Sequence, residues 1–153
     1  MEAAARMSIT DLFETKGEQH FRDLEARSIA RFLENGPVVL ATGGGAFMRE
    51  ETRRHVAEKA VSIWLNTDIG EIRKRLSRDT TRPLLQTANR EDKIAQLVRA
   101  RAPFHQLADL TIVPGQKRDN KNADQCVAAL HAHLCDGGEN ADRPPATVMG
   151  AAP

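Results

Sequence analysis

Apolar positions along the chain follow two patterns, one typical of amphipathic helices and one typical of buried strands. Helical spacing of apolar side chains predicts helices over residues 18–34, 49–59, 67–78, 91–102 and 123–134. Pro103 is expected to end the fourth of these. Short apolar runs predict strands over residues 38–41, 61–65 and 110–113, the first of them fully buried. Strands that alternate with helices predict an α/β fold with a parallel sheet.

The two ends of the chain differ from this regular pattern. Ser8 is placed to cap a short first helix, with Asp11 three residues later, and Gly17 is expected to break that helix from the next one. Residues 136–153 are rich in Gly, Pro and Ala and show no periodicity. We therefore expect one domain over residues 1–135 and a disordered tail over residues 136–153.

Composition narrows the classes of protein to consider. The chain has 153 residues, of which 41% are hydrophobic and 28% charged, with a formal net charge of +1. This balance does not favour nucleic acid or a membrane surface as a partner, and no apolar run is long enough to span a bilayer. Cys126 and Cys135 have no metal-binding spacing, so we expect reduced thiols in a cytoplasmic protein and no metal site built from protein ligands.

Three consecutive glycines, Gly43, Gly44 and Gly45, follow the first predicted strand. In open α/β sheets ligands bind at the carboxyl ends of the strands, and bare glycines let backbone N–H groups reach an anion there. The alternative is a strained turn or a tight packing of helix on loop. The loop is not a Walker A sequence, because no GK[ST] follows it.

Two arginines on predicted helices are candidates for binding an anion. Arg22 has Glu18 four residues before it and Glu25 three residues after it, which gives either a solvated ladder of ion pairs or a guanidinium held ready for a ligand. Arg101 follows the inward-facing Leu97 by one helical turn, so it points inward too and needs a ligand or a partner. Snorkelling at the helix end is the other possibility for Arg101.

Two further arginines have weaker signals. Arg82 lies in the polar stretch over residues 78–92, which is long enough to be a lid, and a lid arginine can neutralise a transferring phosphoryl group. Arg82 could equally be an ordinary solvated arginine. Arg75 belongs to a basic helix whose charges are typical of a solvated face. The five histidines have no metal or triad spacing, and no role is assigned to them.

Together these segments resemble shikimate kinase over residues 1–113. The resemblance rests on "FRDLEAR" (21–27), "VLATGGGAF" (39–47), "RPLL" (82–85) and "RARAPFHQLADLTI" (99–112), which occur in the family's order. It implies a three-layer α/β/α fold of the P-loop kinase type. It also implies transfer of the γ-phosphoryl group of ATP, with Mg²⁺, to the 3-hydroxyl of shikimate, on the way to chorismate and the aromatic amino acids. The complete family enzyme is expected to act as a monomer.

The resemblance also implies roles for individual residues. Arg22 and Arg101 match the arginines that bind the shikimate carboxylate, and Glu25 matches the acid that orients the first of them. Gly44 and Gly45 match glycines whose backbone contacts shikimate, and Gly43 belongs to the same motif. Arg82 matches the catalytic lid arginine that reaches the ATP phosphates, and Arg75 matches an arginine near the adenine.

One part of the family pattern is absent from this sequence. The family begins with a strand, a GxxxxGK[ST] loop, a helix and a strand that ends in Asp-x-Asp, and none of these motifs occurs here. The resemblance therefore implies an N-terminally truncated kinase that has no activity on its own. Because the missing first strand would lie between 38–41 and 61–65, we expect three strands, with a gap between those two or a re-paired sheet.

Two other functions remain open from the sequence. The first is a non-catalytic relative that keeps the shikimate site for binding or regulation, which the retained Arg22 and Arg101 would also fit. The second is a P-loop kinase for another small hydroxy-acid, such as gluconate. The pair of arginines beside "TGGGA" favours shikimate over gluconate, and Arg82 favours an enzyme over a pure binding protein.

Overall fold

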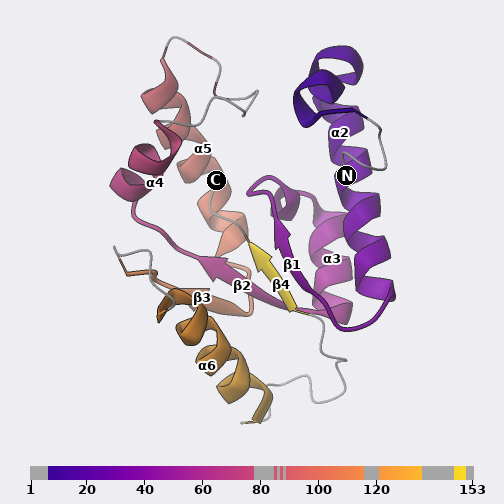
Figure 1. Ribbon diagram of the computed structural model, residues 1–153, viewed down its shortest axis with the longest axis vertical. Helices are drawn as coiled ribbons and strands as arrows, with labels where there is room; N and C mark the ends of the chain where they lie inside the picture. The colour runs from indigo at the N-terminus through magenta and orange to yellow at the C-terminus, as the bar shows by residue number, and fades with distance from the viewer. Residues whose placement is uncertain are drawn as a thin grey trace.

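The fold is a parallel sheet flanked by helices, and the predicted three-layer α/β/α class is confirmed (Figure 1). The computed structural model describes residues 7–77, 85, 87, 89–115, 121–135 and 147–150. The elements are α2 (Ile9–Glu34), β1 (Val39–Thr42), the 3₁₀ helix η1 (Ala46–Met48), α3 (Glu50–Lys59), β2 (Val61–Leu65), α4 (Ile69–Leu76), α5 (Arg90–His105), β3 (Leu110–Ile112), α6 (Lys121–Cys135) and β4 (Thr147–Gly150).

The sheet contains a fourth strand that the sequence pattern did not predict. Its order is β1-β4-β2-β3, and every pairing is parallel. Val148 lies opposite Leu40 of β1 on one side and opposite Ser62 of β2 on the other. The expected gap or three-stranded sheet is therefore wrong, and so is disorder at residues 147–150, while the rest of the predicted tail lies outside the described residues. Backbone groups on the facing edges of β1 and β2 need partners, and β4 supplies them.

Local signals at the start of α2 act as predicted. The Ser8 side chain accepts a hydrogen bond from the backbone N–H of Asp11 at 3.1 Å, which satisfies one of the unpaired donors of the first turn. Gly17 interrupts the helix with φ 79° and ψ 170°, values that favour glycine. The helix resumes after it, so the predicted break is present as a kink inside one long element.

Helix α5 does not end at Pro103, which corrects the prediction. It continues to His105, and the backbone N–H of Gln106 donates to the carbonyl of Ala102 at 2.9 Å. Proline has a backbone φ that suits a helix, and close to the helix end it costs little more than one missing N–H donor. This extra turn carries His105 to the glycine loop.

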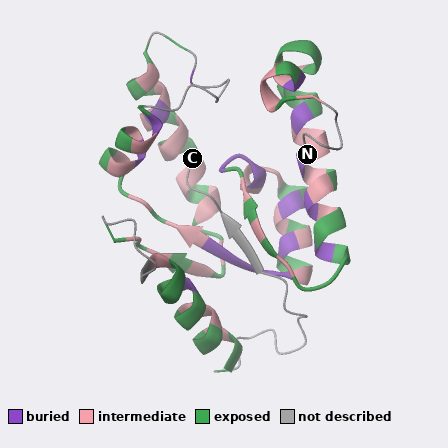
Figure 2. Cartoon of the chain, in the orientation of Figure 1, coloured by how far each residue is buried: buried purple, intermediate pink, exposed green. Residues whose placement is uncertain are grey.

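Burial differs between the first two strands. Strand β1 alternates between exposed and half-buried residues, and Val39 is 69% exposed, so the prediction of full burial is wrong. The alternation means that one face of β1 is covered and the other is not. Strand β2 begins with three buried residues, as its apolar run predicted. Figure 2 shows this contrast, with exposed residues in β1 and buried ones at the start of β2.

The buried apolar side chains form two separate clusters. One lies among α2, η1 and α3 and consists of Ile29, Leu33, Ala46, Val56 and Ala60. The other lies between α4 and α5 and consists of Ile72, Leu76, Leu85 and Ile94. We refer to α2, β1, η1 and α3 as the α2 half, and to β2, α4, α5 and β3 as the α5 half. Strand β4 lies between the two halves in the sheet (Figure 1).

Two smaller expectations also meet the structure. Cys126 is buried, Cys135 is exposed, and both are free thiols. Burial raises the pKa of the Cys126 thiol, which keeps it protonated and unreactive. Over the described ranges, no helix has both the length and the apolar character needed to cross a bilayer.

Candidate functional site

The glycine loop lies at the carboxyl end of β1 and leads into η1. The backbone N–H of Ala46 donates to the carbonyl of Gly43 at 2.9 Å, and that of Met48 donates to the carbonyl of Gly45 at 3.2 Å. Gly44 and Gly45 are buried, whereas Gly43 is exposed. None of the three has a positive φ, so backbone strain does not explain why they are glycines.

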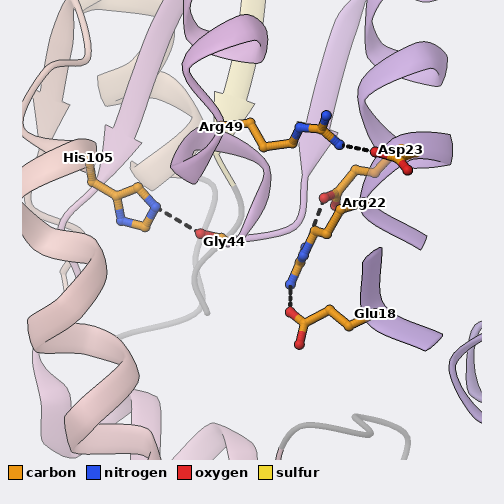
Figure 3. A network of polar contacts seen from close by, with 7 residues as sticks. Glu18, Arg22, Asp23, Gly44, Arg49 and His105 are labelled. Carbon is orange, nitrogen blue, oxygen red and sulfur yellow. Dashed lines mark hydrogen bonds and ion pairs between the residues drawn. The ribbon is translucent and has the colours of Figure 1, made fainter. Parts of the chain in front are cut away.

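The α2 side of the loop presents Arg22 between two carboxylates. Its Nη1 donates to Oε2 of Glu25 at 2.8 Å, and its Nη2 lies 3.3 Å from Oε1 of Glu18. The Glu25 side chain is 9% exposed, whereas that of Glu18 is 52% exposed. A buried carboxylate needs such a partner, so the inner pair holds the guanidinium in place, while the outer pair can open into solvent (Figure 3).

Close packing against α2 accounts for two of the glycines. A Cβ added to Gly45 would lie 2.6 Å from Cζ of Arg22, far inside van der Waals contact. A Cβ added to Gly43 would lie 3.2 Å from Oε1 of Glu25. In this structure the side chain that approaches the bare backbone is therefore Arg22 itself. This supports the tight-packing interpretation at Gly45, and contact between the loop and a ligand stays a prediction.

The α5 side of the loop presents His105. Its Nε2 lies 3.0 Å from the carbonyl oxygen of Gly44, and because a carbonyl only accepts, Nε2 carries the hydrogen. The imidazole lies beside the indole of Trp64, with ring centroids 5.9 Å apart. Burial is the main cause that lowers the pKa of His105; the charge of Arg101 lowers it further, and the Gly44 carbonyl opposes both. His105 is therefore a neutral donor at neutral pH.

The structure brings most of the predicted substrate-site residues to this loop. Arg22 and Glu25 approach from α2, and Arg101 lies one helical turn before His105 on α5, half-buried and near enough for its charge to act on the imidazole. Arg75 is half-buried on α4, which packs against α5 and not against the loop. Arg82 lies outside the described residues.

Contacts between distant segments support the loop, and sequence reasoning missed them. Nη1 of Arg49 donates to Oδ1 of Asp23 at 2.6 Å and lowers the pKa of that carboxyl, which ties the start of α3 to α2 (Figure 3). Nη1 of Arg53 donates to the carbonyls of Phe47 and Met48 at 2.7 and 2.8 Å. Its guanidinium also lies 4.9 Å from the ring centre of Phe104 on α5, a distance typical of a cation–π contact.

The arrangement suits a small carboxylate ligand. A guanidinium can bind a carboxylate through two parallel hydrogen bonds. Arg22 faces two glutamates, so an incoming anion would have to displace the exposed Glu18 while Glu25 stays in place. Within the part of the chain that the structure describes, no three His, Cys, Asp or Glu side chains gather as a metal site would require.

Comparison with known proteins gives consistent matches. A sequence model of the shikimate kinase family matches residues 1–131. The chain is 54% identical over 151 residues to the shikimate kinase of Bradyrhizobium diazoefficiens, covering 99% of this chain and 72% of the relative. It is 51% identical over 135 residues to the shikimate kinase of Rhodopseudomonas palustris, covering 88% of this chain and 66% of the relative.

Solved structures match in fold as well. Shikimate kinase from Acinetobacter baumannii in complex with shikimate superimposes with a TM-score of 0.80 at 30% identity, covering 90% of this chain and 75% of that one. Shikimate kinase from Bacteroides thetaiotaomicron superimposes with a TM-score of 0.73 at 26% identity, covering 88% and 78%. The chain therefore spans between 66% and 78% of the length of these four proteins.

Proposed function

Because the chain belongs to the shikimate kinase family, we propose that it serves the ATP-dependent phosphorylation of the 3-hydroxyl of shikimate, in chorismate and aromatic amino acid biosynthesis. The observation that carries this proposal is the position of Arg22, which buried Glu25 holds against Gly45 on the α2 side of the glycine loop, while Arg101 lies on the α5 side. Two arginines on opposite sides of a loop can bind one carboxylate from two directions. A relative solved with shikimate bound shares this fold.

In this proposal each site residue has a distinct task. Arg22 and Arg101 bind the shikimate carboxylate, Glu25 orients Arg22, and the backbone of Gly43–Gly45 contacts the ring. Glu18 leaves Arg22 when the ligand arrives, because its exposed ion pair is worth only about 0.2–1 kcal/mol. Arg82 acts on the phosphates of ATP and Arg75 near its adenine.

The residues present do not fit the phosphates and Mg²⁺ of ATP. The sequence has no GxxxxGK[ST] loop, and no candidate metal cluster occurs in the described ranges. Positioning and charge neutralisation supply nearly all of phosphoryl-transfer catalysis. We therefore assign shikimate recognition to these 153 residues and expect them to transfer no phosphoryl group by themselves. Action in the cytoplasm as a monomer stays a prediction.

Isothermal titration calorimetry with shikimate tests the proposal on the purified chain. We expect saturable binding without ATP, weakened about tenfold by Glu25→Gln, because Arg22 then loses a charge-assisted hydrogen bond of about 1.5–3 kcal/mol. Glu18→Gln is the matched control on the same arginine, and its affinity should be unchanged or up to about threefold tighter, since it removes a weak competitor.

Two outcomes would contradict this function. Titration with gluconate that gives tighter binding than shikimate would favour a kinase for a different hydroxy-acid. Turnover of ATP and shikimate by the 153-residue chain, followed in a coupled assay, would show that the assignment of recognition alone is wrong.

A further inference from the structure

We propose that His105 is a positioning residue of the shikimate site, which holds the glycine loop to α5 and thereby sets the separation of Arg22 and Arg101. The inference rests on the proposed function, because it concerns the same ligand. Its basis is the 3.0 Å contact between Nε2 of His105 and the carbonyl oxygen of Gly44, which joins segments 61 residues apart in the sequence (Figure 3).

The carbonyl of Gly44 is the one that η1 leaves without a local donor. The carbonyls of Gly43 and Gly45 accept from the backbone of Ala46 and Met48, whereas that of Gly44 accepts from the imidazole. Gly44 is buried, and a buried carbonyl without a donor costs about as much as a lost hydrogen bond. The loop conformation therefore depends on a donor supplied by α5.

The two residues in this contact are close in sequence to the two carboxylate-binding arginines. Gly45 follows Gly44 directly and packs against the guanidinium of Arg22. Arg101 precedes His105 by one turn of α5, so the two side chains lie on the same side of the helix. Any change in the distance from His105 to Gly44 is thus passed to the distance between the two guanidinium groups.

The hydrophobic clusters do not fix that distance. Arg22 belongs to the α2 half and Arg101 to the α5 half, and each half has its own cluster of buried residues. Specific contacts between the halves must set the geometry, and His105 makes the one that lies at the glycine loop itself. A histidine suits the task because it donates while neutral and adds no charge beside Arg101.

Calorimetry with shikimate on three variants tests the inference. His105→Phe keeps a ring beside Trp64 and removes the donor, so we expect binding about tenfold weaker than in the wild-type chain. His105→Gln keeps an N–H donor at a similar reach and should bind within about threefold of wild type. His131→Phe, on the exposed side of α6, is the matched control and should not change binding.

A double-mutant cycle separates positioning from general loss of structure. If His105 acts through Arg101, then His105→Phe should weaken binding much less when Arg101 is already Ala, whereas a purely structural defect should weaken both backgrounds equally. Equal binding by wild type, His105→Phe and His105→Gln would overturn the inference and leave the proposed function standing. A wild-type chain that does not bind shikimate would overturn the proposed function first.

Discussion

The α2 half and the α5 half present opposite kinds of surface to the same glycine loop. From the α2 half, the loop meets a charged arrangement in which Arg22 lies between Glu18 and Glu25 and fills the space beside Gly45. From the α5 half, it meets a neutral hydrogen bond from His105 to Gly44. One side is fixed by ion pairing and close packing, and the other by a single donor.

The difference shows where the site is robust and where it is sensitive. The charged side is assembled within one helix, so local spacing maintains it. The neutral side depends on how the two halves sit relative to one another. Contacts that join the halves, such as the pairing of β4 and the stacking of Arg53 on Phe104, are therefore part of the binding site although they are distant from the carboxylate.

Removal of β4 should have the largest effect on this comparison. Truncation after residue 146 deletes the strand that pairs with both β1 and β2. We expect the free energy of unfolding to fall by about 2–4 kcal/mol, since each lost hydrogen bond contributes roughly 0.5–1.5 kcal/mol net. Urea unfolding followed by circular dichroism measures it.

The matched control for this truncation ends the chain after residue 150 and keeps β4. It should unfold at the same urea concentration as the full chain. Unchanged stability of the shorter truncation product would mean that β1 and β2 do not depend on β4.

Gly45→Ala tests the charged side of the loop and should have the next largest effect. The added Cβ collides with the Arg22 guanidinium, which must leave its place beside Glu25. We expect shikimate affinity to fall roughly 30-fold, about 2 kcal/mol, which is typical for a displaced charge partner. Calorimetry measures it, and Gly115→Ala, whose Cβ would meet its nearest neighbour at 3.9 Å, serves as the control. Undiminished affinity in Gly45→Ala would show that Arg22 can bind from another position.

The smallest expected effect concerns the pH dependence of the neutral side. Burial holds the pKa of His105 below its ordinary value of 6.5. As the pH falls through 6.5, the unfolded chain gains a proton that the folded chain does not, so the folded state loses stability on acidification. Thermal unfolding between pH 8 and pH 5 should therefore show a steeper loss for the wild-type chain than for His105→Gln. Equal slopes would mean that the imidazole is not desolvated.

The sequence by itself determined everything that depends on neighbours within a few residues. It located the kink at Gly17, the cap at Ser8, the strands β1 to β3 and the ladder of Glu18, Arg22 and Glu25, because helical and strand periodicity act over short distances. A conserved order of such short segments was also enough to indicate the family. The spacing of four residues between Arg101 and His105 was visible too, and it could have drawn attention to that histidine.

Only the tertiary structure decided which distant segments meet. It placed residues 147–150 between β1 and β2, carried α5 past Pro103 to bring His105 to Gly44, and showed that Arg22 itself occupies the space beside Gly45. No local pattern encodes these contacts, because each depends on satisfying a buried donor, acceptor or strand edge with whichever group the fold brings near. The glycine triplet was visible in the sequence, and the partners that require it became visible only in the folded chain.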